Sequence, residues 1–564
     1  MNTATLAETH ELAATTVHAS ALLAISTSLV ACGGGGGGGT AAPPATAPVA
    51  SIAPNEAARF LLQAQFSASD AEISQVQAMG FAVWLSVQVN APASTNGWDW
   101  QIAQGYNSST AVNSVVPADH MMWQQLIISS DAVRKRMALA LSEIFVVSST
   151  GVPIPSRSLA VAQYWDTLVS NALGNFRTLL GDITLNPAMG VYLNTKGNQK
   201  ADPVAGRVPD ENYSREVMQL FTLGLYELNL DGSLKLTGSN PMETYGQNDV
   251  TQLARVFTGW DYDPTGSVAV TNPLSVKSPM RLTASLHETG ASTFLGTTIA
   301  ANTPGAAALT QALDALFNHA NVAPFISKQL IQRLVTSNPS AAYVRRVAAV
   351  FTNNGSGVRG DLKAVLTAIL LDAEARDTTL LNSPTWGKQR EPMLRLVQWA
   401  RTFSSSSSNG QWLVGDLSDP ATRLGQSPLR AGSVFNFFRP GYVPPNTALA
   451  TQSLTAPEFQ LTNESSVAGY LNFMLSTIKN GFNAANGGLA APAYSAELAL
   501  VNDPTALLAR LNLLLCAGQL SSATVSSITT AIASISTSTA TGQINRVCAA
   551  VLLVMAAPEY LIQK

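Results

Sequence analysis

Apolar side chains recur at helical spacing along most of this chain. The pattern is clear in residues 55–90, where it breaks at Gly80, and it returns in residues 121–147 and 158–180. Positions three or four residues apart share one face of an α-helix, so such a repeat indicates amphipathic helices that bury that face. We therefore expect two helices joined at Gly80, and one helix in each of the two later segments.

Helix-boundary residues mark the clearest helix near the C-terminus. Asp503 is a suitable N-cap, Pro504 fits the first helical position, and Gly518 follows the last apolar turn. A further helix is expected to begin at Ser521 or Ser522. These patterns predict a mainly α fold with a body of many helices.

The spacing of apolar residues changes in the middle of the chain. Residues 226–237 alternate apolar and polar side chains around an Asp-Gly pair, which is a strong signal for a β-hairpin. A second β-like segment covers residues 286–299, and a helical pattern over residues 248–260 lies between them. We expect a small irregular α+β insertion at about residues 225–300 within the helical body.

The N-terminal segment resembles a bacterial lipoprotein signal followed by a tether. An apolar run over residues 19–30 leads to Cys32, and seven glycines and a Thr/Ala/Pro-rich stretch follow it. The resemblance implies a signal peptide over residues 1–32, lipid on Cys32, and a flexible tether over residues 33–50. The folded body, residues 51–564, would then be held at a membrane of the bacterial envelope, facing the periplasm or on the outer membrane.

One feature of this signal departs from the usual pattern. Residues 1–18 contain no Lys or Arg, although signal peptides begin with a basic region, and they carry Glu8 and Glu11. Either the true start lies elsewhere or the signal is weak, and the alternative is a disordered cytosolic tail. Later apolar runs are shorter than the roughly 18 to 20 residues that span a bilayer, so the run over residues 547–557 is expected to form a core helix.

Charge and cysteine content restrict the chemistry of the body. The formal net charge is -3 over 564 residues, which provides no basic field to attract nucleic acid, so no nucleic-acid partner is expected. Cys516 and Cys548 both lie in apolar helical segments. They either form a disulfide in an oxidising periplasm or remain two buried thiols.

The most polar part of this weakly charged chain is residues 208–224. Glu211, Asn212, Arg215 and Glu216 fall on one predicted helix, among apolar residues, and only 12% of the whole chain is charged. Glu211 and Arg215 are four residues apart, as are Asn212 and Glu216, so each pair shares a helix face. Because the surroundings are apolar, we expect a buried polar network that holds this helix against residues 192–198 and 390–391.

The functional alternative makes the same helix one wall of a site. Glu216 would act as a general base or metal ligand, and His287 would come from the insertion. Glu211, Asn212, Glu216 and His287 are the candidate ligands of a divalent, calcium-like cation, since hard cations prefer carboxylate and carbonyl oxygens. The histidines lack the spacing of a zinc site, which disfavours zinc chemistry.

Several motifs in this order resemble the bacterial family catalogued as domain of unknown function 1800. They are Ala57-Ala-Arg-Phe-Leu-Leu, Asn186-Pro-Ala-Met-Gly-Val-Tyr-Leu-Asn, Glu211-Asn-Tyr-Ser-Arg-Glu, Gln247-Asn-Asp-Val, His287-Glu288 and Gly387-Lys-Gln-Arg-Glu-Pro. The resemblance covers nearly all the chain after residue 50. It implies an exported protein that is encoded beside a second exported protein, one resembling phosphatases and sulfatases.

The chain departs from that family at two places. Many members carry a histidine where this chain has Ser142-Glu143-Ile144-Phe145, and after His287 an Asp and a Lys where it has Glu288 and Ser292. A catalytic role at those positions is therefore weakened. The sequence predicts an accessory or interaction protein that acts with the phosphatase-like or sulfatase-like partner; the alternative is a metal-assisted hydrolase that uses the 208–224 helix and His287.

Overall fold

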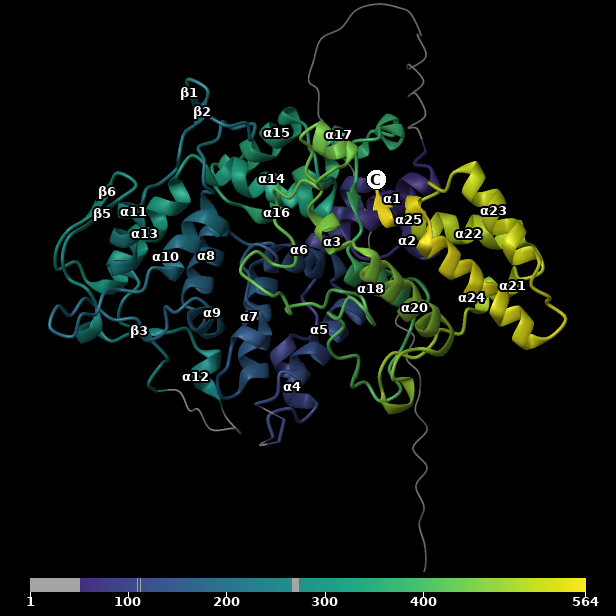
Figure 1. Cartoon of the computed structure of the whole chain (residues 1–564), viewed down its shortest axis with the longest axis horizontal. Coiled ribbons are helices and arrows are strands. Elements are labelled where there is room, and N and C mark those ends of the chain that lie inside the picture. The colour runs from purple at the N-terminus through teal and green to yellow at the C-terminus, as the bar shows by residue number, and fades with distance from the viewer. Residues whose placement is uncertain (1–50, 109, 112, 266–272) are drawn as a thin grey trace, which may run out of the picture. The chain divides into compact units, whose positions relative to one another are not determined.

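Residues 51–564, apart from residues 109, 112 and 266–272, are described by the computed structural model. Most of these residues form α-helices, with four small antiparallel pairs of strands among them, so the expected mainly α fold is confirmed (Figure 1). The described residues form one unit, Ser51–Lys564. Residues 1–50, which include Cys32 and the segments expected to form a signal peptide and a tether, lie outside the described residues.

The elements follow one another in three groups along the chain. The first group is α1 (Pro54–Ala64), α2 (Asp70–Met79), α3 (Phe81–Val89), α4 (Gly97–Ala103), α5 (Val116–Ile128), α6 (Ala132–Ser142), η1 (Ser149–Gly151), α7 (Arg157–Asn171), α8 (Phe176–Thr184) and α9 (Pro187–Tyr192). The second group is α10 (Asn212–Glu216), η2 (Val217–Thr222), β1 (Leu236–Thr237), β2 (Asn240–Pro241), α11 (Gln247–Val256), β3 (Trp260–Asp261), α12 (Leu274–Lys277), β4 (Arg281–Leu282), η3 (Ala284–Leu286), β5 (Ser292–Phe294), β6 (Thr297–Ile299), α13 (Gly305–Asn318), α14 (Val322–Leu334), α15 (Ala341–Thr352), α16 (Leu362–Leu371) and α17 (Ala373–Arg376). The third group is η4 (Thr379–Asn382), β7 (Lys388–Gln389), α18 (Pro392–Thr402), α19 (Ala448–Thr451), η5 (Pro457–Leu461), α20 (Glu464–Asn480), η6 (Ala484–Asn486), α21 (Ser495–Ala499), α22 (Pro504–Cys516), α23 (Ser522–Ala533), α24 (Ala540–Ala556), α25 (Pro558–Leu561) and β8 (Ile562–Gln563).

Three of the expected long helical segments are divided more often than their apolar pattern indicates. Residues 55–90 form three helices, because Ser69 caps α2 by accepting a hydrogen bond from the N–H of Glu72. Residues 121–147 contain two helices, and Arg401 donates hydrogen bonds to three carbonyls at the end of α5. Residues 158–180 divide where Asn175 caps α8. Polar caps within apolar surroundings thus override the periodicity.

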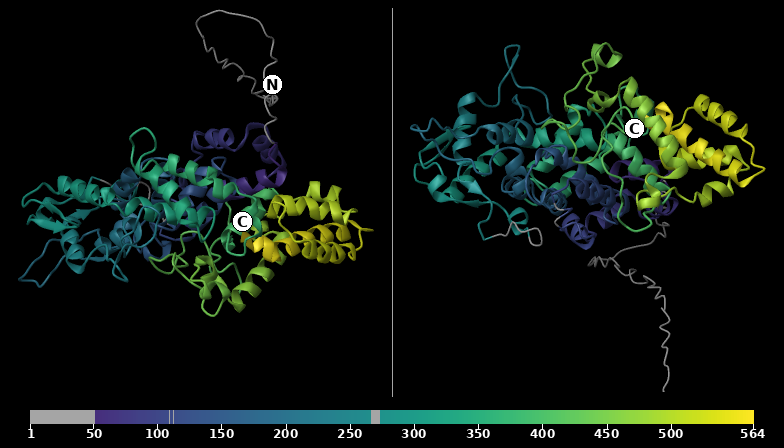
Figure 2. Two further views of the ribbon diagram at one scale, coloured as in Figure 1. Left: turned by 90° about the horizontal axis from the view of Figure 1, so that it is seen from above. Right: turned by 60° about the horizontal axis from the view of Figure 1, so that its bottom comes forward.

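The boundaries predicted near the C-terminus are confirmed. Asp503 accepts hydrogen bonds from the N–H groups of Thr505 and Ala506, Pro504 is the first residue of α22, and Ser521 caps α23. Helices α22, α23 and α24 pack together, and α22 also contacts α1 from the other end of the chain. In Figure 2 these C-terminal helices are yellow and α1 is purple.

Cys516 and Cys548 do not pair. Both are buried free thiols, and burial raises the pKa of Cys516 to about 12 and that of Cys548 to about 11. Cys516 lies near Arg390 and Glu559, whereas the Cys548 thiol points to the carbonyl of Ile478. The disulfide alternative is therefore wrong for this structure, and the two thiols act as small apolar groups in the core.

The hairpin expected over residues 226–237 forms, but its strands are short. Leu228 pairs with Leu234 across the turn, where Gly232 has a φ of 76°. The chain then turns back again, so that β1 pairs with β2 and Tyr226 pairs with Glu243. We call residues 225–243 the arm, because β1 and β2 lie at the end of a loop that projects from the helices (Figure 1).

The secondary structure described for the rest of the insertion, residues 244–300, also agrees with the elements expected from its apolar pattern. Residues 248–260 contain α11, and the segment over residues 286–299 contains the hairpin of β5 and β6, whose turn includes Gly296. Helix α11 packs against β5. Among the described residues, no helix is long and apolar enough to cross a membrane.

Gly259 is the glycine of the insertion that a side chain would disturb most directly. Its φ is 82°, and a Cβ atom there would lie 2.9 Å from the backbone nitrogen of His287 and 2.9 Å from the carbonyl oxygen of Thr283. Gly296 has a similar φ of 72° but no heavy atom within 4 Å of the corresponding position. We expect Gly259→Ala to lower the free energy of unfolding by about 1 to 3 kcal/mol more than Gly296→Ala. Denaturant titration of both variants measures the difference. Equal losses of unfolding free energy would show that the positive φ, and not the close backbone neighbours of Gly259, causes the loss.

Candidate functional site

The helix expected over residues 208–224 is shorter and changes its winding. α10 covers only Asn212–Glu216, and η2 continues it as a π-helix over Val217–Thr222. The N–H of Leu223 accordingly donates to the carbonyl of Met218, five residues earlier, at 2.8 Å. The prediction of one continuous α-helix is therefore wrong for this segment. π-Helical turns occur frequently at functional sites.

The Glu211–Arg215 pair lies at the surface and not in the expected buried network. Its ion pair measures 3.3 Å, and the two side chains are 32% and 41% exposed. Glu211 also accepts hydrogen bonds from Gln247 and Thr251 of α11, and the Thr251 bond contributes most to lowering the pKa of Glu211. These contacts join α10 to α11. Exposed pairs of this kind contribute about 0 to 1 kcal/mol to stability.

Glu216 is buried, as expected, but it does not meet His287. Burial raises the pKa of Glu216, and its neighbouring ionisable groups are Arg215, Tyr192 and Tyr245. His287 is buried elsewhere, with Nδ1 2.9 Å from the carbonyl oxygen of Thr258.

The candidate metal ligands are not gathered into one site. Asn212 lies beside Asp210, whose carboxylate accepts a hydrogen bond from its N–H at 2.8 Å. In the part of the chain that the structure describes, no hydrogen bond or ion pair joins Asn212 to Glu216 or to His287. Within that same part, no three His, Cys, Asp or Glu side chains converge to hold a metal ion. The proposed site of Glu211, Asn212, Glu216 and His287 therefore has no support from geometry.

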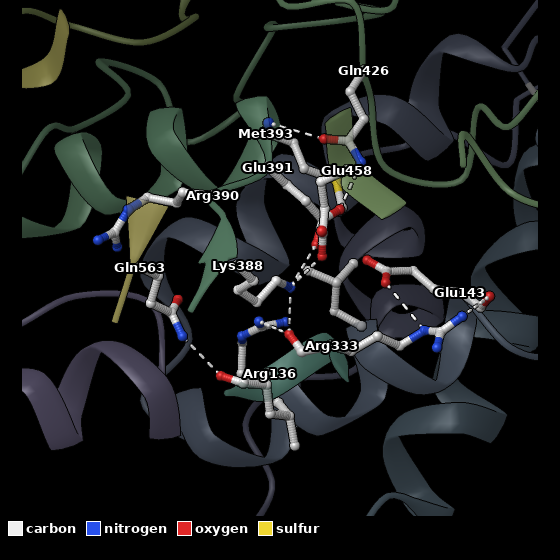
Figure 3. A network of polar contacts seen from close by, with 12 residues as sticks. Arg136, Glu143, Arg333, Lys388, Arg390, Glu391, Met393, Gln426, Glu458 and Gln563 are labelled. Carbon is white, nitrogen blue, oxygen red and sulfur yellow. Dashed lines mark hydrogen bonds and ion pairs between the residues drawn. The ribbon is translucent and has the colours of Figure 1, made fainter. Parts of the chain in front are cut away.

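A buried cluster of charges lies where α6, α14, β7 and η5 meet (Figure 3). Lys388 of β7 is at its centre: Nζ lies 3.0 Å from Oε1 of Glu458 and 3.7 Å from Oε1 of Glu391. The same nitrogen donates a hydrogen bond of 2.7 Å to the carbonyl of Arg333. All three charged side chains are at most 2% exposed, so their charges are compensated by one another and not by water.

Two arginines and a third glutamate extend this cluster. Nε of Arg333 lies 3.3 Å from Oε2 of Glu143, and Arg136 donates a hydrogen bond of 2.7 Å to the carbonyl of Arg333. Gln426 donates to Glu391 at 2.7 Å. Burial and the nearby Glu391 carboxylate raise the pKa of Glu143 well above its usual range. We call Arg136, Glu143, Arg333, Lys388, Glu391 and Glu458 the buried charge cluster.

A cavity of about 470 Å³ lies next to this cluster. One stripe of α14 forms a wall, because its lining residues recur at helical spacing. The other walls come from η2, from the arm, from residues 434–441 and from the turn after α6. The residues of α14 that line the cavity are Phe325, Lys328, Gln329, Gln332 and Arg333.

Most of the cavity wall is apolar, and its ionisable side chains come from two places. Glu143 and Arg333 belong to the buried charge cluster, and Lys328 lies one turn before Arg333 on α14. The apolar lining includes Leu220, Leu225 and Phe435. An apolar cavity of a few hundred Å³ with a few convergent polar groups is the usual form of a ligand site.

Neither the buried charge cluster nor the cavity was predicted from the sequence. In the sequence, residues 142–145 stand out only as a departure from the family pattern, and residues 390–391 were predicted only to contact the 208–224 helix. The available signal was the polar stripe of α14, since Lys328, Gln329, Gln332 and Arg333 share one face of an otherwise apolar helix. A polar face on a helix in the core indicates a network or a cavity.

Comparison with known proteins places nearly all of the described body in one family. A family model described as "Protein of unknown function (DUF1800)" matches residues 59–562. No curated protein and no solved structure matches the chain.

Proposed function

The chain belongs to the DUF1800 family, and we propose that it is a lipid-anchored accessory protein of the bacterial envelope that binds a segment of a partner protein. The observation that carries the proposal is an apolar surface that continues from the arm into the cavity. Leu225, Tyr226, Leu228 and Leu234 belong to both. Contiguous exposed apolar surface is typical of a binding site for another molecule.

The arm exposes more large apolar side chains than a free loop in water requires. Six of its large apolar side chains are between 36% and 54% exposed: Leu225, Tyr226, Leu230, Leu234, Leu236 and Met242. Asn321, the residue before α14, fixes the base of the arm, because its amide donates to the carbonyls of Leu223 and Tyr226 and its oxygen accepts from the N–H of Leu228. The surface is therefore held in place before a partner binds, which reduces the entropy cost of binding.

The location and the partner are proposed from the sequence. The segment before the described body resembles a lipoprotein signal with Cys32 as the lipidated residue, and the Gly-rich stretch would give the body freedom to reach a partner. The family resemblance implies a phosphatase-like or sulfatase-like exported protein as that partner. The alternative, a metal-assisted hydrolase at Glu216 and His287, has less support because these residues have separate surroundings.

Co-purification with a phosphatase-like or sulfatase-like protein encoded beside this chain, which the family resemblance implies, tests the proposal. We expect the full-length protein to retain that partner, and Leu236→Glu to lose it, because a charge would be placed where an apolar contact forms. Leu236 is 54% exposed, so the substitution leaves the fold intact. Leu475→Glu on α20, where the leucine is 55% exposed, is the matched control and should retain the partner. Retention by Leu236→Glu would show that the arm is not the binding surface, and failure of the unaltered protein would exclude this partner.

A further inference from the structure

Lys328 is unusual among the residues that line the cavity. Its ammonium group makes no hydrogen bond or ion pair with the residues that the structure describes, although burial lowers its pKa. The methylene stem packs against the turn of the arm, where a Cβ atom on Gly232 would lie 3.6 Å from Cδ. An ammonium group that is partly desolvated and has no protein acceptor gains from a ligand that supplies one.

The neighbouring Arg333 cannot take that role. Its guanidinium donates hydrogen bonds to the carbonyl of Glu143 at 3.0 Å and to the carbonyl of Gln329 at 3.2 Å. Its Nε also faces the Glu143 carboxyl group at 3.3 Å. The N–H groups of Arg333 therefore already have partners in and next to the buried charge cluster. The ammonium group of Lys328 supplies the hydrogen-bond donors that a ligand can use.

The charge balance of the cavity favours an anion. Glu143 is buried and its carboxyl oxygens make no hydrogen bond to the described residues. Its raised pKa favours the neutral acid, which would not repel an anion. If Glu143 is ionised, the two positive charges of Lys328 and Arg333 still exceed its one negative charge. The net charge of the cavity lining is therefore positive in either protonation state of Glu143.

We infer that Lys328 receives a carboxylate at the end of an apolar chain that occupies the cavity. This inference rests on the proposed binding function and specifies the chemistry of the bound segment. The wall around Phe325, Leu220 and Phe435 suits an apolar body. Of the two cationic side chains among the described residues that line the cavity, Lys328 is the one without a protein partner. It can therefore compensate one negative charge, and a dianion such as a phosphate group would keep a second charge uncompensated. A cationic ligand would be repelled, and a neutral one would leave the charge of the ammonium group uncompensated.

Two sources could supply this chemistry: the C-terminal carboxylate of a partner protein that ends in apolar residues, or a free fatty acid. Calorimetry on the full-length protein with octanoate and with octanol tests the carboxylate. We expect octanoate to bind about 10- to 100-fold more tightly than octanol, because a charge-assisted hydrogen bond forms in the cavity. Lys328→Met should remove that preference without changing octanol binding, and Lys328→Arg should retain it. Lys479→Met, on the exposed lysine of α20, is the matched control and should behave as the unaltered protein.

Each outcome of this experiment decides a separate point. Equal binding of octanoate and octanol, or the same preference in Lys328→Met, would overturn the inference, and so would the absence of binding by either probe. An acetylated peptide that ends in two leucines, compared in its acid and amide forms, separates the sources. Preference for the acid peptide supports a partner segment. Binding of octanoate without the acid peptide supports Lys328 as a carboxylate site but contradicts the proposed occupation of the cavity by a partner.

Discussion

Replacement of Lys388 by methionine is expected to lower the free energy of unfolding by about 3 to 5 kcal/mol. The side chain is 1% exposed, and its Nζ is within 3.7 Å of carboxyl oxygens of both Glu391 and Glu458. Methionine keeps the apolar stem but removes the charge, so two buried carboxylates lose their nearest cation. The hydrogen bond to the carbonyl of Arg333 is lost as well.

Chemical denaturation followed by tryptophan fluorescence measures this loss as a lower midpoint. Lys235→Met is the matched control, because Lys235 forms an ion pair of 3.0 Å with Glu227 but is 38% exposed. That variant should lose no more than about 1 kcal/mol. If both variants lose the same free energy, the buried charge cluster does not contribute to stability beyond an ordinary surface pair.

A double variant separates the cost of broken pairing from the value of the cluster itself. Lys388→Met combined with Glu458→Gln removes the cation together with the acid that lies 3.0 Å from it, and leaves Arg136 and Arg333 with Glu143 and Glu391. Because an unpaired buried charge is more costly than a neutral group of the same shape, this variant should be more stable than Lys388→Met alone. A double variant that is less stable would show that Glu458 retains enough compensation from Arg136 and Arg333 once Lys388 is removed.

The fold class and several boundaries could be predicted because they depend on local sequence. Asp503 accepts hydrogen bonds from free backbone N–H groups at the start of α22, and Pro504 has no N–H that needs a partner. The Asp-Gly turn of the arm is closed by local hydrogen bonds from Ser233 to Asp231. The breaks at Ser69 and Asn175 were missed. Their caps are single polar residues inside segments whose apolar pattern continues on both sides.

The buried charge cluster could not be predicted, for a different physical reason. Arg136, Arg333, Lys388 and Glu458 come from four elements that are distant in sequence, and tertiary packing alone brings them together. The charged residues in and next to α10 are closer in sequence and therefore form a more evident pattern. Glu211 and Arg215 nevertheless lie at the surface, because that face of the helix meets polar residues of α11. The high density of charged residues in the 208–224 segment therefore predicted a polar helix correctly but did not show whether its charges are buried.

Stability below neutral pH is expected to depend on His120. This residue of α5 is buried, its Nδ1 lies 3.2 Å from the Tyr106 hydroxyl, and burial lowers its pKa from 6.5 to about 4. The preceding acid, Asp119, is paired with Arg430 and does not compensate a charge on the imidazole. Protonation of His120 in the folded protein therefore has no local anion to favour it.

The sign of this effect follows from proton binding. Between pH 6.5 and about pH 4 the unfolded chain protonates this histidine and the folded chain does not, so stability decreases as the pH falls through that range. At 1.36 kcal/mol per unit, the decrease is about 3 kcal/mol. His120→Gln keeps a polar partner for Tyr106 without this titration. Denaturant unfolding at pH 7 and pH 4 should therefore show a decrease that is about 3 kcal/mol larger in the unaltered protein than in His120→Gln. An equal decrease in both would mean that His120 accepts its proton in the folded state as readily as in the unfolded chain, and that the environment of α5 around Tyr106 opens to water at low pH.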